Sequence, residues 1–356
     1  MAGQNKSSLE EKFKLVADTI RAYPQQLRQA WDEINATYFP EDYQNIKNVV
    51  LCGMGGSALG ARIVDSLVMN RLRVPFEIYN EFHLPNYVND ETLVIVSSYS
   101  GNTEETIEAT NEAISRGAKI FGIATGGKLA KLLQDRKTPS YIFNPINNPS
   151  GQPRMSTGYA IGSVLGILNK VEVINMSNEE IEEAVSSMNE ALTAYNEGSP
   201  KDLNLAYKYS RLLKHKAPIL VSSEHLVGTT YTIKNQFNES AKTFCVLFDI
   251  PELNHHLMEG LKNPAKIREI FHFIFFQSNL YSEAVIKRYP ITCEVVEKNG
   301  FEYSVFSPKS ETKLAQVFET LAFGSSMVYF LTKEYNIDPI EIPWVDYFKE
   351  ALKSNK

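Results

Sequence analysis

Two clusters of glycine and hydroxyl residues near the front of the chain have the composition of an anion site. The first spans residues 52–57 (CGMGGS) and the second spans residues 97–106 (SSYSGNTEET). Each cluster follows an apolar run typical of a strand and leads into a helical pattern, so both are expected at helix N-termini on the same edge of one sheet. Free backbone N–H groups and the helix dipole attract anions there, and glycine allows close approach. The two clusters therefore predict a phosphate site.

Other interpretations of these clusters stay open. Residues 53–58 also match GxGxxA, the dinucleotide fingerprint, and Glu77 and Glu81 stand roughly where a ribose-binding acid belongs. A structural role is open too, because Thr103 and Thr106 could simply be helix N-caps. The second cluster favours phosphate, because a nucleotide site does not require Ser-x-Ser-Gly-Asn-Thr after the third strand, whereas a compact phosphate monoester would use it.

The elements that hold these clusters alternate between strand and helix patterns. Apolar runs predict strands at residues 48–52, 76–80, 92–97, 119–124 and 140–143, with helices at 57–68, 103–116 and 128–134. Near-continuous apolar strands separated by helices indicate a parallel sheet covered on both faces. The first half is therefore predicted to be a doubly wound α/β domain, with its ligand at the carboxyl ends of the strands.

The same alternation returns in the second half of the chain. After a loop at 145–153, a small-residue helix at 159–168 and an acidic helix at 177–196, the patterns predict strands at 218–222, 243–248, 272–276 and 291–296 and helices at 227–241, 281–288 and 311–335. The acidic helix is interpreted as a solvated connector between domains. The second half looks like another α/β unit of the same plan without the glycine-serine clusters, which indicates a degenerate duplication.

The chain is accordingly divided into four parts. An N-terminal helix covers residues 1–30, a first α/β domain with the phosphate site covers 31–170, a connecting helix covers 171–205, and a second α/β domain covers 206–356. The last part ends in a tail with a short helix, at 338–352, that could fold back over the cleft.

Composition narrows the class of protein. The 356 residues are 43% hydrophobic and 22% charged, with a net charge of -6, which argues against non-specific binding to nucleic acid or an anionic membrane. The three cysteines (Cys52, Cys245 and Cys293) have no CxxC spacing, so neither zinc nor a disulfide framework is expected. The N-terminus has no signal-peptide core, and no apolar stretch is judged long enough to span a bilayer. A cytoplasmic protein is expected.

These motifs carry a resemblance. GMGGSALG and SSYSGNTEET look like the sugar isomerase (SIS) fold, which binds phosphorylated sugars. Gln152-Pro153-Arg154, Asn238-Glu239-Ser240-Ala241-Lys242 and Glu252-Leu253-Asn254-His255 resemble the bifunctional phosphoglucose/phosphomannose isomerases, over about residues 30–350. The resemblance implies two SIS subdomains and the isomerisation of glucose 6-phosphate, and of mannose 6-phosphate, to fructose 6-phosphate through a cis-enediol. It implies no cofactor or metal, and a homodimer. A non-catalytic SIS-domain sugar-phosphate sensor and a dinucleotide enzyme are the alternatives.

The resemblance also assigns roles to residues. Glu239 matches the base that forms the enediol, although from helix spacing alone it would be a solvated partner of Lys242 or Lys234. Arg154 matches the group that stabilises the enediolate. His255 matches the ring-opening histidine, which in this superfamily comes from the neighbouring subunit, and His256 beside it is an alternative.

The remaining assignments concern ring opening and substrate binding. Lys349 resembles the family's C-terminal lysine that assists ring opening, although Lys353 could be mistaken for the matching residue. For the phosphate the resemblance names Ser98, Ser100 and Thr103, and along the sugar it names Gly55, Gly56 and Ser57. The chain departs from the family after Arg154, where Met155-Ser156-Thr157 replaces small apolar residues, and this puts the accepted epimer in question.

Overall fold

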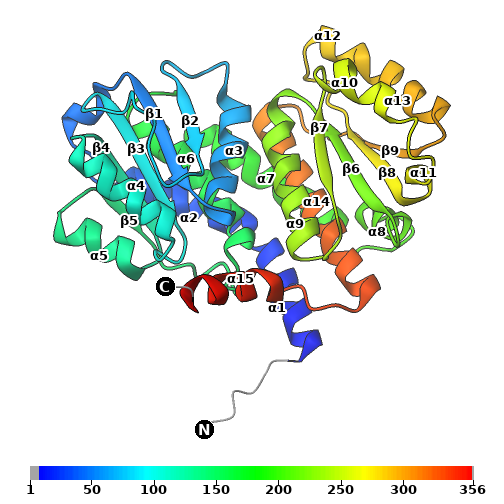
Figure 1. Cartoon of the computed structure of the whole chain (residues 1–356), viewed down its shortest axis with the longest axis horizontal. Coiled ribbons are helices and arrows are strands. Elements are labelled where there is room, and N and C mark those ends of the chain that lie inside the picture. Colours follow the sequence, from blue (N-terminus) through cyan, green and yellow to red (C-terminus); the bar gives the residue numbers. More distant parts are fainter. Residues whose placement is uncertain (1–7, 355–356) are drawn as a thin grey trace.

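The computed structural model describes residues 8–354, which form two α/β units that lie side by side (Figure 1). The sheet of the first unit is entirely parallel, with the order β2-β1-β3-β4-β5. Its strands are β1 (Asn48–Gly53), β2 (Phe76–Tyr79), β3 (Thr92–Ser98), β4 (Lys119–Ala124) and β5 (Ser140–Ile142). All five overlap the predicted runs, and the doubly wound α/β class is confirmed.

Both faces of this sheet are covered by helices. Along β1, Val49 and Leu51 belong to one hydrophobic core, whereas Val50 and Cys52 belong to a second core on the other face. This explains why the strands read as continuous apolar runs, since successive side chains point to opposite faces and both faces are dry. The first core includes α2 (Tyr23–Ala36), α3 (Gly56–Val68) and α6 (Thr157–Lys170), and the second includes α4 (Glu104–Ser115) and α5 (Gly127–Asp135).

From residue 8 onward, two helices precede the first sheet. The region predicted as one N-terminal helix, residues 1–30, contains α1 (Leu9–Arg21) and the start of α2, and its first seven residues lie outside the described residues. The apolar positions Phe13, Ile20, Leu27 and Trp31 are all buried, as their helical spacing predicts. A short 3-10 turn, η1 (Glu41–Gln44), leads from α2 to β1.

The second unit repeats the plan with fewer strands. Its four strands are all parallel, in the order β7-β6-β8-β9. They are β6 (Ala217–Ser222), β7 (Val246–Asp249), β8 (Phe271–Phe276) and β9 (Glu302–Phe306). The helices are α8 (Leu205–Leu212), α9 (Val227–Glu239), α10 (Leu253–Gly260), α11 (Ile267–Ile270), α12 (Glu283–Ile286) and α13 (Arg288–Lys298), with the turn η3 (Glu224–Leu226) before α9.

One predicted strand of this unit is wrong. Residues 291–296 lie within helix α13, and the fourth strand is β9, further along the chain. The buried residues of α13 are Tyr289, Thr292, Cys293 and Val296, which recur at helical spacing. The run contains β-branched residues typical of strands, and packing against the sheet overrides that local preference.

The prediction that the acidic helix is a solvated connector is also wrong, because one face of this helix is buried. Helix α7 (Asn178–Tyr195) buries one face, which includes Ile181, Val185 and Met188, and it packs against α14 (Lys313–Tyr335). Its acidic residues lie on the opposite face, so the helix is amphipathic rather than solvated all round.

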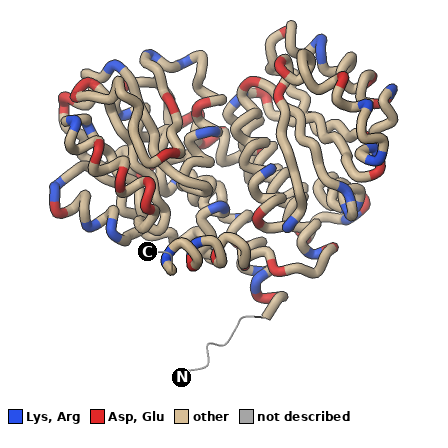
Figure 2. The backbone as a smooth tube through the Cα atoms, in the orientation of Figure 1, with Lys and Arg blue, Asp and Glu red and all other residues tan. Residues whose placement is uncertain are grey.

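Helix α14 is the central helix of the second unit. Among the described residues it is the one helix long and apolar enough to cross a membrane, with a mean hydropathy of 1.3, so the expectation that no such stretch exists is wrong. Its apolar window is 100% buried inside the protein, where α1, α7, α8 and α9 surround it. This burial is typical of the core helix of a globular protein. Acidic and basic residues are interspersed along the backbone of both units (Figure 2).

The two units meet where α3 and α9 cross. A Cβ atom at Gly228, in the first turn of α9, would lie 2.1 Å from the carbonyl oxygen of Arg62 on α3. The added Cβ atom would clash with backbone atoms of α3. Unlike a side chain, the backbone cannot avoid the clash by adopting another rotamer. Gly228 therefore fixes how closely the second unit packs on the first.

We expect Gly228→Ala to destabilise the protein by about 1–3 kcal/mol, because the added methyl group forces the two helices apart. The shift of the urea unfolding midpoint measures this loss. Gly260→Ala is the matched control, because the nearest atom to its added Cβ, Leu257 Cδ1, is 4.0 Å away. An equal loss in both variants would mean that the helix crossing is not the cause.

Candidate active site

The first predicted cluster forms the N-terminus of α3. Gly55 is the N-cap residue and has a φ of 49°, a conformation that favours glycine. A Cβ atom at Gly56 would lie 2.7 Å from the carbonyl carbon of Pro153, so only glycine lets this turn pack on the segment that carries Arg154. Ser57 Oγ accepts a hydrogen bond of 2.9 Å from the backbone N–H of Tyr99, which joins the two clusters.

The second cluster forms the turn between β3 and α4. The buried hydroxyl of Ser98 lies 2.8 Å from that of Thr103, which is the N-cap residue of α4. Thr103 makes no side-chain capping bond, so the capping interpretation does not describe it. Ser100 is exposed, and its Oγ accepts a hydrogen bond of 3.3 Å from the N–H of Asn102. The hydroxyls thus line a turn at a helix N-terminus, as an anion site requires.

Glu77 and Glu81 are the acidic residues that a dinucleotide site would use to bind the ribose. Glu77 accepts a hydrogen bond of 2.7 Å from the Tyr87 hydroxyl, and Glu81 lies exposed beyond β2. At the end of β2 it is Asn80 that contacts the first cluster, by donating to the Gly53 carbonyl. Glu77 therefore already has a hydrogen-bond partner, and the side chain that contacts the first cluster from the end of β2 is an amide rather than a carboxylate.

Arg154 is the most buried charge near the two clusters. It lies in the 3-10 turn η2 (Pro153–Met155), and 2% of its side chain is exposed. Nε donates to Ser240 Oγ at 3.0 Å, and Nη1 donates to Gln152 Oε1 at 2.9 Å. Nη2 donates at 2.8 Å to each of two carbonyl oxygens, those of Pro339 and Ile340. Burial lowers the pKa of the guanidinium from its ordinary value; it nevertheless stays protonated near neutral pH.

Glu239 faces Arg154 from the last residue of α9. Its Oε2 lies 3.7 Å from Arg154 Nη1, and 31% of its side chain is exposed. Burial raises the pKa of the Glu239 carboxyl above its ordinary value, although the positive charge of Arg154 opposes that rise. A raised pKa makes a carboxylate a stronger base, and a fixed cation beside it can stabilise negative charge on a substrate.

Two lysines complete the positive surroundings of Glu239. The charges of Lys349 and Lys242 both act to lower its pKa, so both ammonium groups lie near the carboxylate. Lys349 belongs to α15 (Pro343–Ser354), which lies below the first unit in Figure 1. Lys353 is an exposed residue in the last turn of the same helix.

Sequence reasoning missed Lys242 as a site residue and treated it only as a helical partner of Glu239. It follows the end of α9 with a φ of 48°, and its Nζ donates to the carbonyl oxygens of Ser240 at 3.3 Å and Asp338 at 2.5 Å. Partial burial of the ammonium group, together with the charge of Arg154, lowers the pKa of Lys242 to about 8. Its position three residues after Glu239 in the same motif was the available signal.

The clusters and the charged residues belong to one continuous site. Asn148 Nδ2 donates to the Tyr99 hydroxyl at 2.9 Å and to the Gln152 carbonyl at 3.0 Å. Tyr99 lies in the second cluster, and Gln152 binds Arg154. The loop that closes the first sheet therefore connects the predicted phosphate site with the Arg154–Glu239 pair.

The residues that depart from the family pattern pack beside the turn that carries Arg154. Met155, Ser156 and Thr157 are all buried. Ser156 Oγ donates to the Pro153 carbonyl at 2.8 Å, and Thr157 Oγ1 donates to the Arg154 carbonyl at 3.3 Å. Their hydroxyls therefore hold the Arg154 turn, and Ser156 also lines a small hollow beside Gly56 and Ser57.

The structure does not bring the two histidines to this site within one chain. Helix α9 begins at the carboxyl end of β6 and returns along the sheet, so Glu239 lies at the amino edge of the second sheet. His255 and His256 are exposed on α10, which follows the carboxyl end of β7. Figure 1 shows α10 at the top of the second unit and α15 at the bottom.

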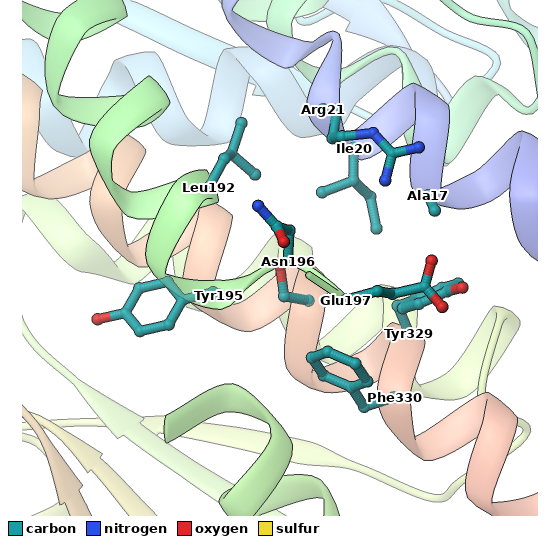
Figure 3. A pocket seen from close by; sticks show the side chains of 10 residues that line it. Ala17, Ile20, Arg21, Leu192, Tyr195, Asn196, Glu197, Tyr329 and Phe330 are labelled. Carbon is teal, nitrogen blue, oxygen red and sulfur yellow. The ribbon is translucent and has the colours of Figure 1, made fainter. Parts of the chain in front are cut away.

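One hollow of about 20 Å³ is lined by Gly56 and Ser57 of the first cluster, together with Tyr99 of the second. Four other hollows in the described part of the chain contain none of the predicted site residues. One is a cavity of about 20 Å³ between α1, the end of α7 and α14 (Figure 3). It is lined mainly by apolar side chains, among them Ile20, Leu192 and Phe330. In residues 8–354 no group of three or more His, Cys, Asp or Glu side chains is placed to hold a metal ion.

Known proteins resemble this chain in sequence and in fold. A family model described as the bacterial phospho-glucose isomerase C-terminal SIS domain matches residues 202–352. A bifunctional phosphoglucose/phosphomannose isomerase from Caldicellulosiruptor bescii is 30% identical over 95% of this chain and 99% of the relative. One from Thermoplasma acidophilum is 29% identical over 86% of this chain and 89% of the relative. The crystal structure of a hypothetical protein from Thermus thermophilus has a TM-score of 0.76 at 15% identity, covering 98% of this chain and 94% of that one.

The raised pKa of Glu239 leads to a stability prediction. A carboxyl whose pKa is higher in the folded than in the unfolded state destabilises the fold at pH values above its pKa, and this penalty disappears as the pH falls through that pKa. We therefore expect Glu239→Gln to raise the melting temperature at pH 8 and to lose this advantage near pH 4. Calorimetry at a series of pH values measures it, with exposed Glu259→Gln as the control. A lower melting temperature at pH 8 would contradict the prediction.

Proposed function

Because the chain belongs to the family of bifunctional phosphoglucose/phosphomannose isomerases, we propose that it interconverts glucose 6-phosphate and mannose 6-phosphate with fructose 6-phosphate. The observation that carries the proposal is the pair formed by Glu239 and the buried Arg154, 3.7 Å apart and connected to the two glycine-hydroxyl clusters. A non-catalytic SIS sensor would need the clusters but would leave this pair unexplained. We place the enzyme in the cytoplasm, since its buried free cysteines suit a reducing compartment.

The reaction moves a carbonyl group between C1 and C2. It requires a base that carries a proton between the two carbons, and a positive group near the oxygens of the cis-enediolate. We assign the first role to Glu239, whose pKa is raised by burial toward the working range of a base. We assign the second to Arg154, whose guanidinium is already held by other hydrogen bonds and so needs little rearrangement during the reaction.

Binding and ring opening use other groups. Ser98, Ser100 and Thr103 are proposed to bind the phosphate at the N-terminus of α4, and Gly55, Gly56 and Ser57 to line the sugar. Lys349 is proposed to assist ring opening near Glu239. Glucose and mannose 6-phosphate differ only at C2, so use of both requires the open chain to turn about the C2–C3 bond and present either face to Glu239.

We further propose that the active unit is a homodimer. His255 is assigned to ring opening, and in one chain it lies at the edge of the second sheet opposite to Glu239. A neutral imidazole is suited to transfer a proton to the ring oxygen. The neighbouring subunit would therefore supply His255, with His256 as the alternative.

Two variants should affect the chemical step and substrate binding separately. We expect Glu239→Gln to lower kcat about 10³-fold while the protein still binds substrate, because only the proton transfer is lost. Replacing Ser100 with Ala and Thr103 with Val together should raise KM about tenfold with a smaller effect on kcat, since phosphate contacts are made in both ground and transition states. Coupled assays with glucose 6-phosphate and mannose 6-phosphate measure both constants. No turnover of either sugar by the wild type would reject the proposed function.

Mixing two inactive variants tests the shared site. Glu239→Gln and His255→Ala chains are reassembled together, and each mixed dimer then holds one site with both native residues. We expect the mixture to recover about a quarter of the wild-type activity, because half of the dimers are mixed and each has one of its two sites intact. His256→Ala is the matched control and should be active alone. Absence of recovery would place both residues of a site in the same chain.

A further inference from the structure

The C-terminal segment that carries Lys349 is anchored by residues outside the proposed catalytic set. Helix α14 ends at Tyr335, and a turn of seven residues, 336–342, leads to α15. In α15 no residue is buried, and five large apolar side chains are exposed on it: Trp344, Val345, Tyr347, Phe348 and Leu352. Within one chain, packing of α15 therefore does little to fix its position, and the turn before it sets where Lys349 lies.

Asp338 organises this turn. Its Oδ1 accepts hydrogen bonds from the backbone N–H groups of Ile340, at 2.8 Å, and Glu341, at 3.1 Å. Its Oδ2 forms an ion pair with Lys12, which also binds Glu341 Oε1 at 2.8 Å. Lys12 lies on α1, near the other end of the chain, and only 13% of its side chain is exposed. Helix α1 is thus bound to the 336–342 turn that precedes α15.

The same turn touches the catalytic pair. Arg154 Nη2 donates to the carbonyl oxygens of Pro339 and Ile340, and Lys242 Nζ donates to that of Asp338. The group that faces Glu239 is therefore bound to the turn, so a displacement of the turn would be transmitted to the site.

We propose that Lys12 and Asp338 are positioning residues for Lys349: their ion pair holds the 336–342 turn in place, and the turn sets the position of α15 relative to Glu239. Neither residue needs to contact the sugar phosphate for this effect. The proposal rests on the proposed function for the role of Lys349, whereas the anchoring of α15 by Lys12 can be measured without it.

The test is a double-mutant cycle with Lys12→Met, Lys349→Met and the combined variant. We expect Lys12→Met alone to lower kcat about tenfold, because small displacements of a catalytic group cost that much or more, and to leave KM within about twofold. In the Lys349→Met background the same substitution should lower kcat by a clearly smaller factor, since the residue it positions is already absent and only the contacts of the turn with Arg154 and Lys242 remain. Lys12→Arg should retain most of the activity. Lys14→Met, an exposed lysine on the same helix, is the matched control.

The pH profile supplies a readout that a loss of general stability would not move. The charged groups facing Glu239 are Arg154 from η2, Lys242 after α9 and Lys349 from α15. Displacement of Lys349 removes a positive charge, so the pKa of Glu239 rises further and the acid limb of kcat/KM moves to higher pH in Lys12→Met. Lys349→Met should show the same shift, and Lys14→Met should show none.

Two results would overturn the proposal, and both differ from a failure of the proposed function. If Lys12→Met lowers kcat by the same factor with and without Lys349, its effect does not pass through Lys349. If backbone hydrogen exchange in residues 343–354 is equally fast in Lys12→Met and Lys14→Met, the pair does not anchor α15. An inactive wild type would reject the isomerase function, and the exchange measurement would still decide the anchoring.

Discussion

The arrangement of the site depends on the burial of one guanidinium group. A buried charge is tolerated only where its polar groups find partners, and the side chain of Arg154 finds them in three separate parts of the chain. Gln152 belongs to the first unit, Ser240 follows α9 of the second, and the carbonyl oxygens of Pro339 and Ile340 belong to the C-terminal turn. Satisfying this charge therefore requires the two α/β units and the tail to come together, and the site lies where they meet.

Burial also shifts the pKa values of Glu239 and Arg154, which face each other in the site. Withdrawal from water raises the pKa of Glu239 and lowers that of Arg154, while their mutual attraction opposes both shifts. The pair is not closed into a tight ion pair, because the distance of 3.7 Å leaves the carboxylate without a direct hydrogen bond to the guanidinium. A carboxylate in this state remains available to accept a proton from a substrate, which a fully satisfied salt bridge would hinder.

Much of the fold followed from local patterns, and the failures have physical causes. The strands of the first sheet could be predicted because they are buried on both faces and are therefore continuously apolar. Residues 291–296 misled because β-branched residues on one buried helix face resemble a strand when the run is short. The clusters stand out because their chemistry is local in sequence, whereas Glu239 is singled out by the family resemblance, since helix spacing alone suggests a solvated partner of a lysine. The anchoring of the tail could not, since Lys12 and Asp338 are separated by 326 positions and nothing in either neighbourhood indicates the other.

The direction of the strands explains why one chain does not complete the proposed site. In a parallel sheet each strand runs toward the same edge and each connecting helix returns, so the end of a helix and the end of the next strand lie at opposite edges. Glu239 ends α9, and His255 follows β7, whose four residues alone span about 13 Å. No adjustment of a loop reverses this order, because the separation is built into the βαβ connection. If His255 opens the sugar ring, it must come from a second copy, and a two-fold dimer would satisfy both sites by the same exchange of surfaces.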